Sequence, residues 1–194
     1  MFIQILISFF LFLNPFFAVS PASPAALPLL PAPRHEEDGL VWQAERRLSW
    51  EDFQSEADLK EPLHAMTSTN IEVEAKCRGN QMQFEVKCVF KTKDSWSKNK
   101  QSESLLAHEQ MHFDLTEVHA RLLRQKLART PGLCGSDKAR FGKIVDGYFA
   151  GWKTEQDQYD QESNHGLNQQ QQRKWEEKIA RRLQDLSLFA YAGN

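Results

Sequence analysis

Residues 106–114 read Leu106-Ala107-His108-Glu109-Gln110-Met111-His112-Phe113-Asp114. Around this segment, leucines and histidines recur at the three- and four-residue spacing of one face of an α-helix. That face comprises Leu105, Leu106, His108, His112, Leu115, His119, Leu122 and Leu123. The spacing predicts a long helix from about Ser102 to Arg129, and Pro131-Gly132 is expected to end it.

The segment contains the pattern His-Glu-x-x-His. On a helix, His108 and His112 are four residues apart and project from one face, so that their imidazoles can hold one zinc ion. Glu109 lies on the same turn, where its carboxylate can act as a general base toward water that the metal has made acidic. Polar rings on an inward helix face are unfavourable without a partner, and a metal would supply one. The pattern predicts a zinc site, with a solvated or hydrogen-bonded helix face as the alternative.

Two segments before this helix alternate apolar and polar residues, as half-buried strands do. They span residues 71–77 and 82–90, and a turn at residues 78–81 separates them. If Cys77 pairs with Met82, then Ile71 lies opposite Cys88 and every apolar side chain faces one side. The sequence therefore predicts a β-hairpin with one buried face.

The chain has three cysteines, Cys77, Cys88 and Cys134. In the predicted register, Cys77 and Cys88 lie at opposite ends of the hairpin, roughly 20 Å apart at the usual strand rise, and cannot bridge each other. Any disulfide should therefore join Cys134 to one of them, which leaves one free thiol.

Two more helices are predicted after the Pro131-Gly132 stop. The first runs from about Asp137 to Glu162 and ends near Gly166, a residue suited to a left-handed backbone. The second has an exposed start at residues 169–172, followed by an apolar face. That face contains Trp175, Ile179, Leu183 and Leu186. The expected fold class is α+β: a small antiparallel hairpin or sheet packed on a three-helix bundle, with a zincin-like active-site helix.

A catalytic zinc site needs a third protein ligand. His119 lies on the motif face, but seven residues past the second histidine it is roughly 10 Å farther along the axis. The polar cluster at residues 159–166 is the better source. His165 is the first choice because it stands at a helix end beside a glycine; Asp160 and then Glu162 are the alternatives. If no metal binds, this polar cluster would simply be a capped helix end with polar groups at the surface.

Composition and the N-terminal region bear on location and partners. The net charge of the 194-residue chain is −2, and no basic stripe indicates nucleic-acid binding. Residues 1–25 contain an apolar run followed by small residues, which predicts a signal peptide. No Lys or Arg precedes the run, so an uncleaved anchor is the alternative and would be the only membrane contact. Residues 26–39 are expected to be a Pro/Ala-rich linker, and residues 40–190 one domain.

Several short motifs resemble a bacterial family, the domain of unknown function number 922. These are Leu48-Ser49-Trp50 with Asp52-Phe53, Asp94-Ser95-Trp96, the His108 to Asp114 segment, Glu117 with Ala120-Arg121, and Tyr159-Asp160 with Glu162 and His165-Gly166. The resemblance covers about residues 40–186, and Ser163 replaces the usual Thr. The family is described as predicted secreted zinc-dependent proteases, so the resemblance implies export and a zinc-dependent activity on a peptide or protein substrate.

The residues and the resemblance together predict an exported metallopeptidase, located in the periplasm or outside the cell. His108, His112 and His165 are expected to hold Zn²⁺, and Glu109 to be the general base. Three further side chains have candidate roles: Asp114 or Glu117 orienting a ligand imidazole, and Tyr159 stabilising the oxyanion. A non-catalytic zinc-binding domain of the cell envelope, a metal-free structural protein and a zinc hydrolase of another amide are the alternatives.

Overall fold

We analysed the protein as a computed structural model, which describes residues 35–36, 39–57, 59–134 and 138–193. The described residues all lie in one compact unit. The predicted signal peptide and nearly all of the linker lie outside the described residues. In the part of the chain that the structure describes, no helix is both long and apolar enough to cross a membrane.

The longest strands form the predicted hairpin, β4 (Thr69–Arg78) and β5 (Gln81–Phe90). Cys77 pairs with Met82 and Ile71 with Cys88, so the predicted register is confirmed. Gly79 in the turn has a φ of 58°, the left-handed conformation that glycine adopts without strain. Two short strands, β1 (His35–Glu36) and β2 (Gly39–Val41), complete an antiparallel sheet of order β1-β2-β5-β4.

A second, two-stranded antiparallel sheet lies beside the start of the first helix. It consists of β3 (Ala65–Met66) and β6 (Trp96–Ser97), which are separated in sequence by the hairpin. The 3₁₀ turn η1 (Trp50–Asp52) precedes it, and Ser49 and Asp52 form a capping box at its start. These short elements matter because β3 borders the candidate site described below.

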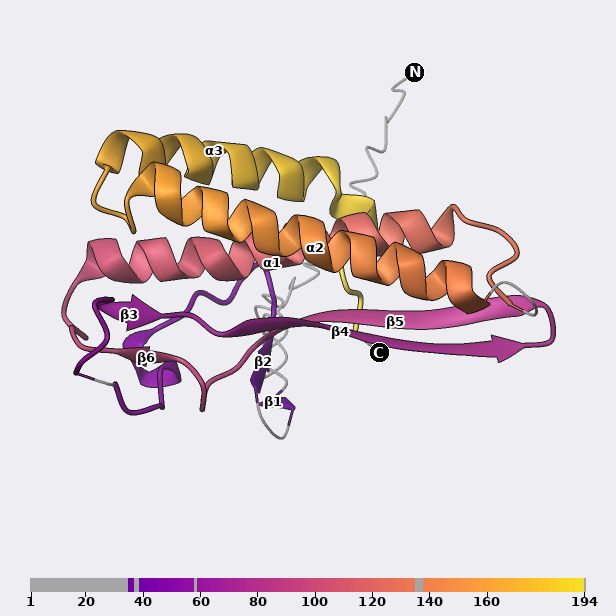
Figure 1. Cartoon of the computed structure of the whole chain (residues 1–194), viewed down its shortest axis with the longest axis horizontal. Coiled ribbons are helices and arrows are strands. Elements are labelled where there is room, and N and C mark those ends of the chain that lie inside the picture. The colour runs from indigo at the N-terminus through magenta and orange to yellow at the C-terminus, as the bar shows by residue number, and fades with distance from the viewer. Residues whose placement is uncertain (1–34, 37–38, 58, 135–137, 194) are drawn as a thin grey trace, which may run out of the picture. The chain divides into compact units, whose positions relative to one another are not determined.

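Three helices lie side by side over the hairpin (Figure 1): α1 (Glu103–Ala128), α2 (Lys138–Ser163) and α3 (Gln169–Asp185). The hydroxyl oxygen of Ser102 accepts a hydrogen bond from the amide of Leu105 and so caps α1 at the predicted position. A short 3₁₀ turn, η3 (Ser187–Phe189), follows α3. The predicted α+β fold class is therefore confirmed.

Helix α1 is central, because it touches the sheet on one side and both other helices on the other. Its sheet side joins an apolar cluster that includes Phe53, Phe90, Phe113 and Leu123. Its other side joins a second cluster that contains Leu115 and the apolar face of α3. A helix buried all round needs each of its polar side chains to have a partner, and this requirement shapes the candidate site.

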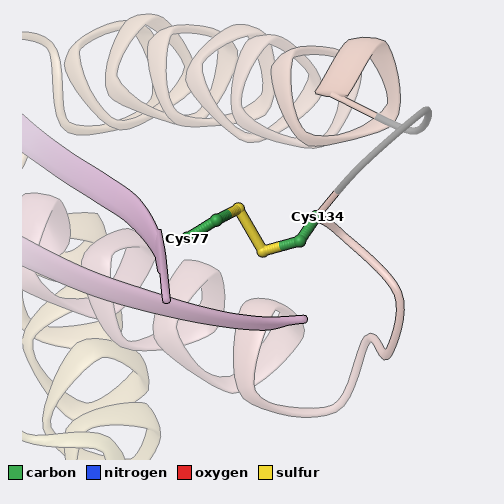
Figure 2. Close-up of a disulfide and its surroundings, with 2 residues drawn as sticks. All are labelled: Cys77 and Cys134. Carbon is green, nitrogen blue, oxygen red and sulfur yellow. A yellow bond between two sulfur atoms is a disulfide. The ribbon is translucent and has the colours of Figure 1, made fainter. Parts of the chain in front are cut away.

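A disulfide joins Cys77 near the hairpin turn to Cys134 in the connection between α1 and α2 (Figure 2). Cys88 is a free, buried thiol. The prediction that Cys134 bonds to one of the two hairpin cysteines is thus confirmed, and the structure identifies the partner. The bond fastens the end of the hairpin that lies farthest from the start of α1 (Figure 1).

Candidate metal centre

Three side chains from α1 and α2 direct their donor atoms to one point. Nε2 of His108 lies 3.1 Å from Oδ1 of Asp160, and Nε2 of His112 lies 3.0 Å from the same oxygen. The two Nε2 atoms are 3.2 Å apart. Donors that surround zinc tetrahedrally at bond lengths near 2.05 Å are about 3.3 Å from one another. The three atoms therefore fit one face of a zinc coordination tetrahedron.

His165 stands next to this trio, in the turn that follows α2. Its Nδ1 is 3.4 Å from Oδ1 of Asp160, and donor atoms of His108, Asp160 and His165 lie within 4.8 Å of one another. The structure thus brings both favoured candidates for the third ligand beside the motif histidines. Asp160 is in contact with both motif histidines, whereas His165 contacts the group through Asp160.

Each motif histidine is held by a glutamine at its other ring nitrogen. Nδ1 of His108 lies 3.3 Å from Oε1 of Gln172 on α3, and Nδ1 of His112 lies 2.6 Å from Oε1 of Gln156 on α2. These contacts place a proton on each Nδ1, so that with a metal bound each Nε2 would be the nitrogen that faces it. The glutamines therefore orient the rings toward the site.

These glutamines correct two expectations from the sequence. Asp114 accepts hydrogen bonds from Trp42, Arg47 and Gln110, and Glu117 pairs with Arg121 and Arg124. Neither carboxylate contacts a ligand imidazole, so neither orients one. Gln172 was expected in an exposed helix start, yet it is buried because α3 packs that turn against α1.

Tyr159 and Glu162 also have roles other than those expected. The hydroxyl of Tyr159 is buried and donates toward Oε1 of Gln172 at 2.8 Å and the carbonyl of His108 at 3.2 Å, and its ring stacks on the His108 imidazole. Burial raises the pKa of the phenol well above its usual value. In this structure the hydroxyl is engaged by Gln172 and His108, and Tyr159 lines neither of the two hollows at the site. Glu162 accepts from Trp175 at the surface and is not a ligand candidate.

Glu109 lies beside the donor cluster. Its carboxylate lines a cavity of about 450 Å³ together with the donor residues. Within the described part of the chain, this carboxylate has no hydrogen bond or ion pair, although Glu109 is only 3% exposed. A buried carboxylate that faces a cavity without a partner is available to bind a proton or a ligand.

A second hollow of about 500 Å³ adjoins the first. The two share Met66, Thr67, His112 and Asp160 in their walls. The first hollow extends along residues 62–65 and α1, and the second extends over the aromatic side chains of α2. The donor cluster can therefore be approached from two sides.

The charges of the cluster stabilise one another. Burial would raise the pKa of Asp160, but hydrogen bonds from His108 and His112 outweigh it and hold this pKa well below its usual value. Burial would lower the pKa of His112, and the bond to Asp160, its charge and that of Glu109 raise it instead. Metal binding therefore competes with protonation of His112.

A known protein family matches most of this chain. Residues 32–166 match the family described as a bacterial protein of unknown function (DUF922). The chain belongs to this family. The match confirms the resemblance seen in the motifs, and it includes α1 and the donor residues of α2 and the following turn. No curated protein and no solved structure matches the chain, so the activity has to be argued from the site itself.

Proposed function

We propose that this protein is an exported, zinc-dependent metallopeptidase. The observation that carries the proposal is the convergence of His108, His112 and Asp160 on one point, with a separation of 3.0–3.2 Å between their donor atoms. Two imidazoles and one carboxylate form a donor set typical of catalytic zinc. Zinc in such a site makes water nucleophilic near neutral pH and polarises a carbonyl group.

Glu109 supplies the proton transfers in this proposal. Its free carboxylate takes a proton from the attacking water and returns it to the leaving amine. A purely structural metal site requires no carboxylate at this position. The unpaired, cavity-facing state of Glu109 therefore favours an enzyme over a zinc-binding interaction domain.

A peptide substrate suits the shape of the site. The hollows on two sides of the donor cluster leave room for a chain that continues in both directions past the bond to be cleaved. Their walls combine apolar side chains, among them Leu63, Leu105 and Trp152, with hydroxyl, amide and charged side chains. Such walls accommodate the side chains of a polypeptide.

Export is supported by the Cys77–Cys134 disulfide, because disulfides persist mainly in oxidising compartments outside the cytoplasm. We propose that residues 1–25 direct the chain to the periplasm or the exterior. N-terminal sequencing of the protein from its native host tests this proposal. A mature N-terminus between residues 20 and 30 supports a cleaved leader, and an intact residue 1 in the membrane fraction supports the anchor.

The central experiment compares the full-length protein with Glu109→Gln. Zinc content is measured on both, and both are screened against a broad peptide library that includes cell-wall peptides. We expect one zinc per chain in each protein, and cleavage by the wild type at a rate at least about 100-fold above that of the variant. Glu103→Gln, an exposed residue on the same helix, is the matched control and should cleave like the wild type. Stoichiometric zinc without cleavage in any protein would favour the non-catalytic domain.

A further inference from the structure

The donors of the candidate site differ in how firmly they are held. The imidazole of His108 is enclosed, bonded to Gln172 and stacked on Tyr159 with 4.8 Å between ring centroids. His112 is fixed at 2.6 Å by Gln156. Their side chains are 3% and 13% exposed. A second hydrogen bond of this kind fixes the orientation of a metal-binding imidazole.

His165 lacks every one of these restraints. Its side chain is 53% exposed and borders the cavity. Within the described residues, the contact of Nδ1 with Asp160 is its one polar contact, and its other ring nitrogen has no partner. The imidazole is therefore free to rotate, although its Nδ1 is already 3.4 Å from a donor oxygen, close to the separation of about 3.3 Å between ligands of one zinc ion.

The backbone beneath this ring is fixed. The amide of His165 donates to the carbonyl of Asp160 at 3.0 Å, and the amide of Gly166 donates to Ser163 Oγ. Gly166 packs so closely on His108 that an added Cβ would lie 2.9 Å from the Cβ of that histidine. A rotating side chain on a fixed backbone can reach the cluster or leave it without any change in the fold.

We propose that His165 is a displaceable fourth donor of the metal site, which closes the site at rest and vacates it for substrate. This inference rests on the proposed zinc binding and adds its regulation. Four protein donors make a closed site of the structural type, and three leave a position for water or substrate. Rotation of a single half-exposed imidazole would convert one state into the other.

Cobalt(II) binding to the full-length protein tests the proposal, since the visible spectrum of cobalt reports its coordination. His165→Ala is compared with Asn164→Ala, which places alanine at a similarly left-handed position (φ 49° against 51°) but keeps the imidazole. Circular dichroism verifies that both variants are folded. We expect the cobalt spectrum of His165→Ala to change, and that of Asn164→Ala to match the wild type.

Metal affinity separates a displaceable donor from an obligatory one. In competition with a chelator, we expect His165→Ala to lose no more than about tenfold in cobalt affinity. We expect Asp160→Ala to lose more than about 100-fold, which exceeds the usual loss when a residue that only hydrogen-bonds to a metal ligand is removed. Acetohydroxamate, which needs a vacant position on the metal, should bind to His165→Ala at least about threefold more tightly than to the wild type.

Two results would overturn the proposal. If His165→Ala matches the wild type in spectrum and acetohydroxamate affinity, His165 never binds the metal. If His165→Ala loses as much metal affinity as Asp160→Ala, His165 is a permanent ligand. Peptide cleavage measured on the same samples separates this proposal from the proposed function. If the cobalt results are as expected but no peptide is cleaved, only the proposed peptidase activity is contradicted. If peptides are cleaved but either overturning result is found, only the proposal that His165 is a displaceable donor is contradicted.

Discussion

Removal of the Cys77–Cys134 disulfide should strongly destabilise the domain and leave the metal site intact. The bond closes a loop with a sequence separation of 57 residues. In the chain-entropy model, a cross-link across a loop of this length lowers the entropy of the unfolded chain by about 14 cal/mol/K. At 25 °C, its loss should therefore reduce the free energy of unfolding by about 4 kcal/mol.

Urea unfolding of the wild type and the Cys77→Ala/Cys134→Ala variant measures this loss. If the free energy of unfolding falls by roughly 2 kcal/mol per molar urea, the urea midpoint of unfolding should fall by about 2 M. A reducing agent should bring the wild type to the same midpoint and have no effect on the variant. Metal affinity should be unchanged, because the bond lies at the end of the molecule away from the start of α1 (Figure 1). A loss below about 1 kcal/mol would refute the reasoning from loop closure.

Three further predictions concern single residues. Gln156→Leu should weaken metal binding by about 10–100-fold in chelator competition, because it frees the second histidine ring. Gly166→Ala should reduce the free energy of unfolding by more than Gly132→Ala. Both positions have positive φ (78° and 71°), but only at Gly166 would the new methyl group meet His108, and urea midpoints compare them. Glu155 has a lowered pKa, because hydrogen bonds from His119, Lys178 and Arg182 outweigh the effect of its burial. The stabilisation that this carboxylate contributes is present above pH 4.5, its unfolded pKa, and is lost as the pH falls toward its lower folded pKa. Glu155→Gln should therefore destabilise the protein at pH 7, and the difference from the wild type should shrink as the pH of the unfolding experiment is lowered.

Local patterns made much of the fold predictable. The hairpin register follows from strict alternation around a turn, because a slip by one residue would turn every apolar side chain to solvent. Ser102 and the Pro131-Gly132 pair mark the ends of α1 because they satisfy or interrupt its terminal hydrogen bonds. The choice between Cys77 and Cys88 as the partner of Cys134 was not predictable, since both face the same side of the hairpin and only the packing of α1 and α2 separates them.

The candidate site was predictable where it depends on one helix and unpredictable where several helices meet. His-Glu-x-x-His fixes the spacing of two donors and the base, but the third donor depends on how α2 crosses α1. That crossing brings Asp160 to the histidines and leaves His165 at the rim. Gln156 carried a usable signal, because it lies four residues before Asp160 and therefore on the same helix face. Gln172 carried none, since its position depends on the packing of a third helix.

The elements around the candidate site are held by contacts of the protein itself. In the part of the chain that the structure describes, no fully enclosed side-chain nitrogen or oxygen lacks a hydrogen-bond partner, and Glu109, whose carboxylate has none, borders the cavity. His108 and His112 bond to Asp160 on one side and to glutamines on the other, so the cluster is satisfied before any ion enters. Two apolar clusters and a disulfide stabilise the surrounding elements. The donors are therefore preorganised, which is what a catalytic site requires, whereas small zinc-folded domains assemble their ligands only when the metal binds.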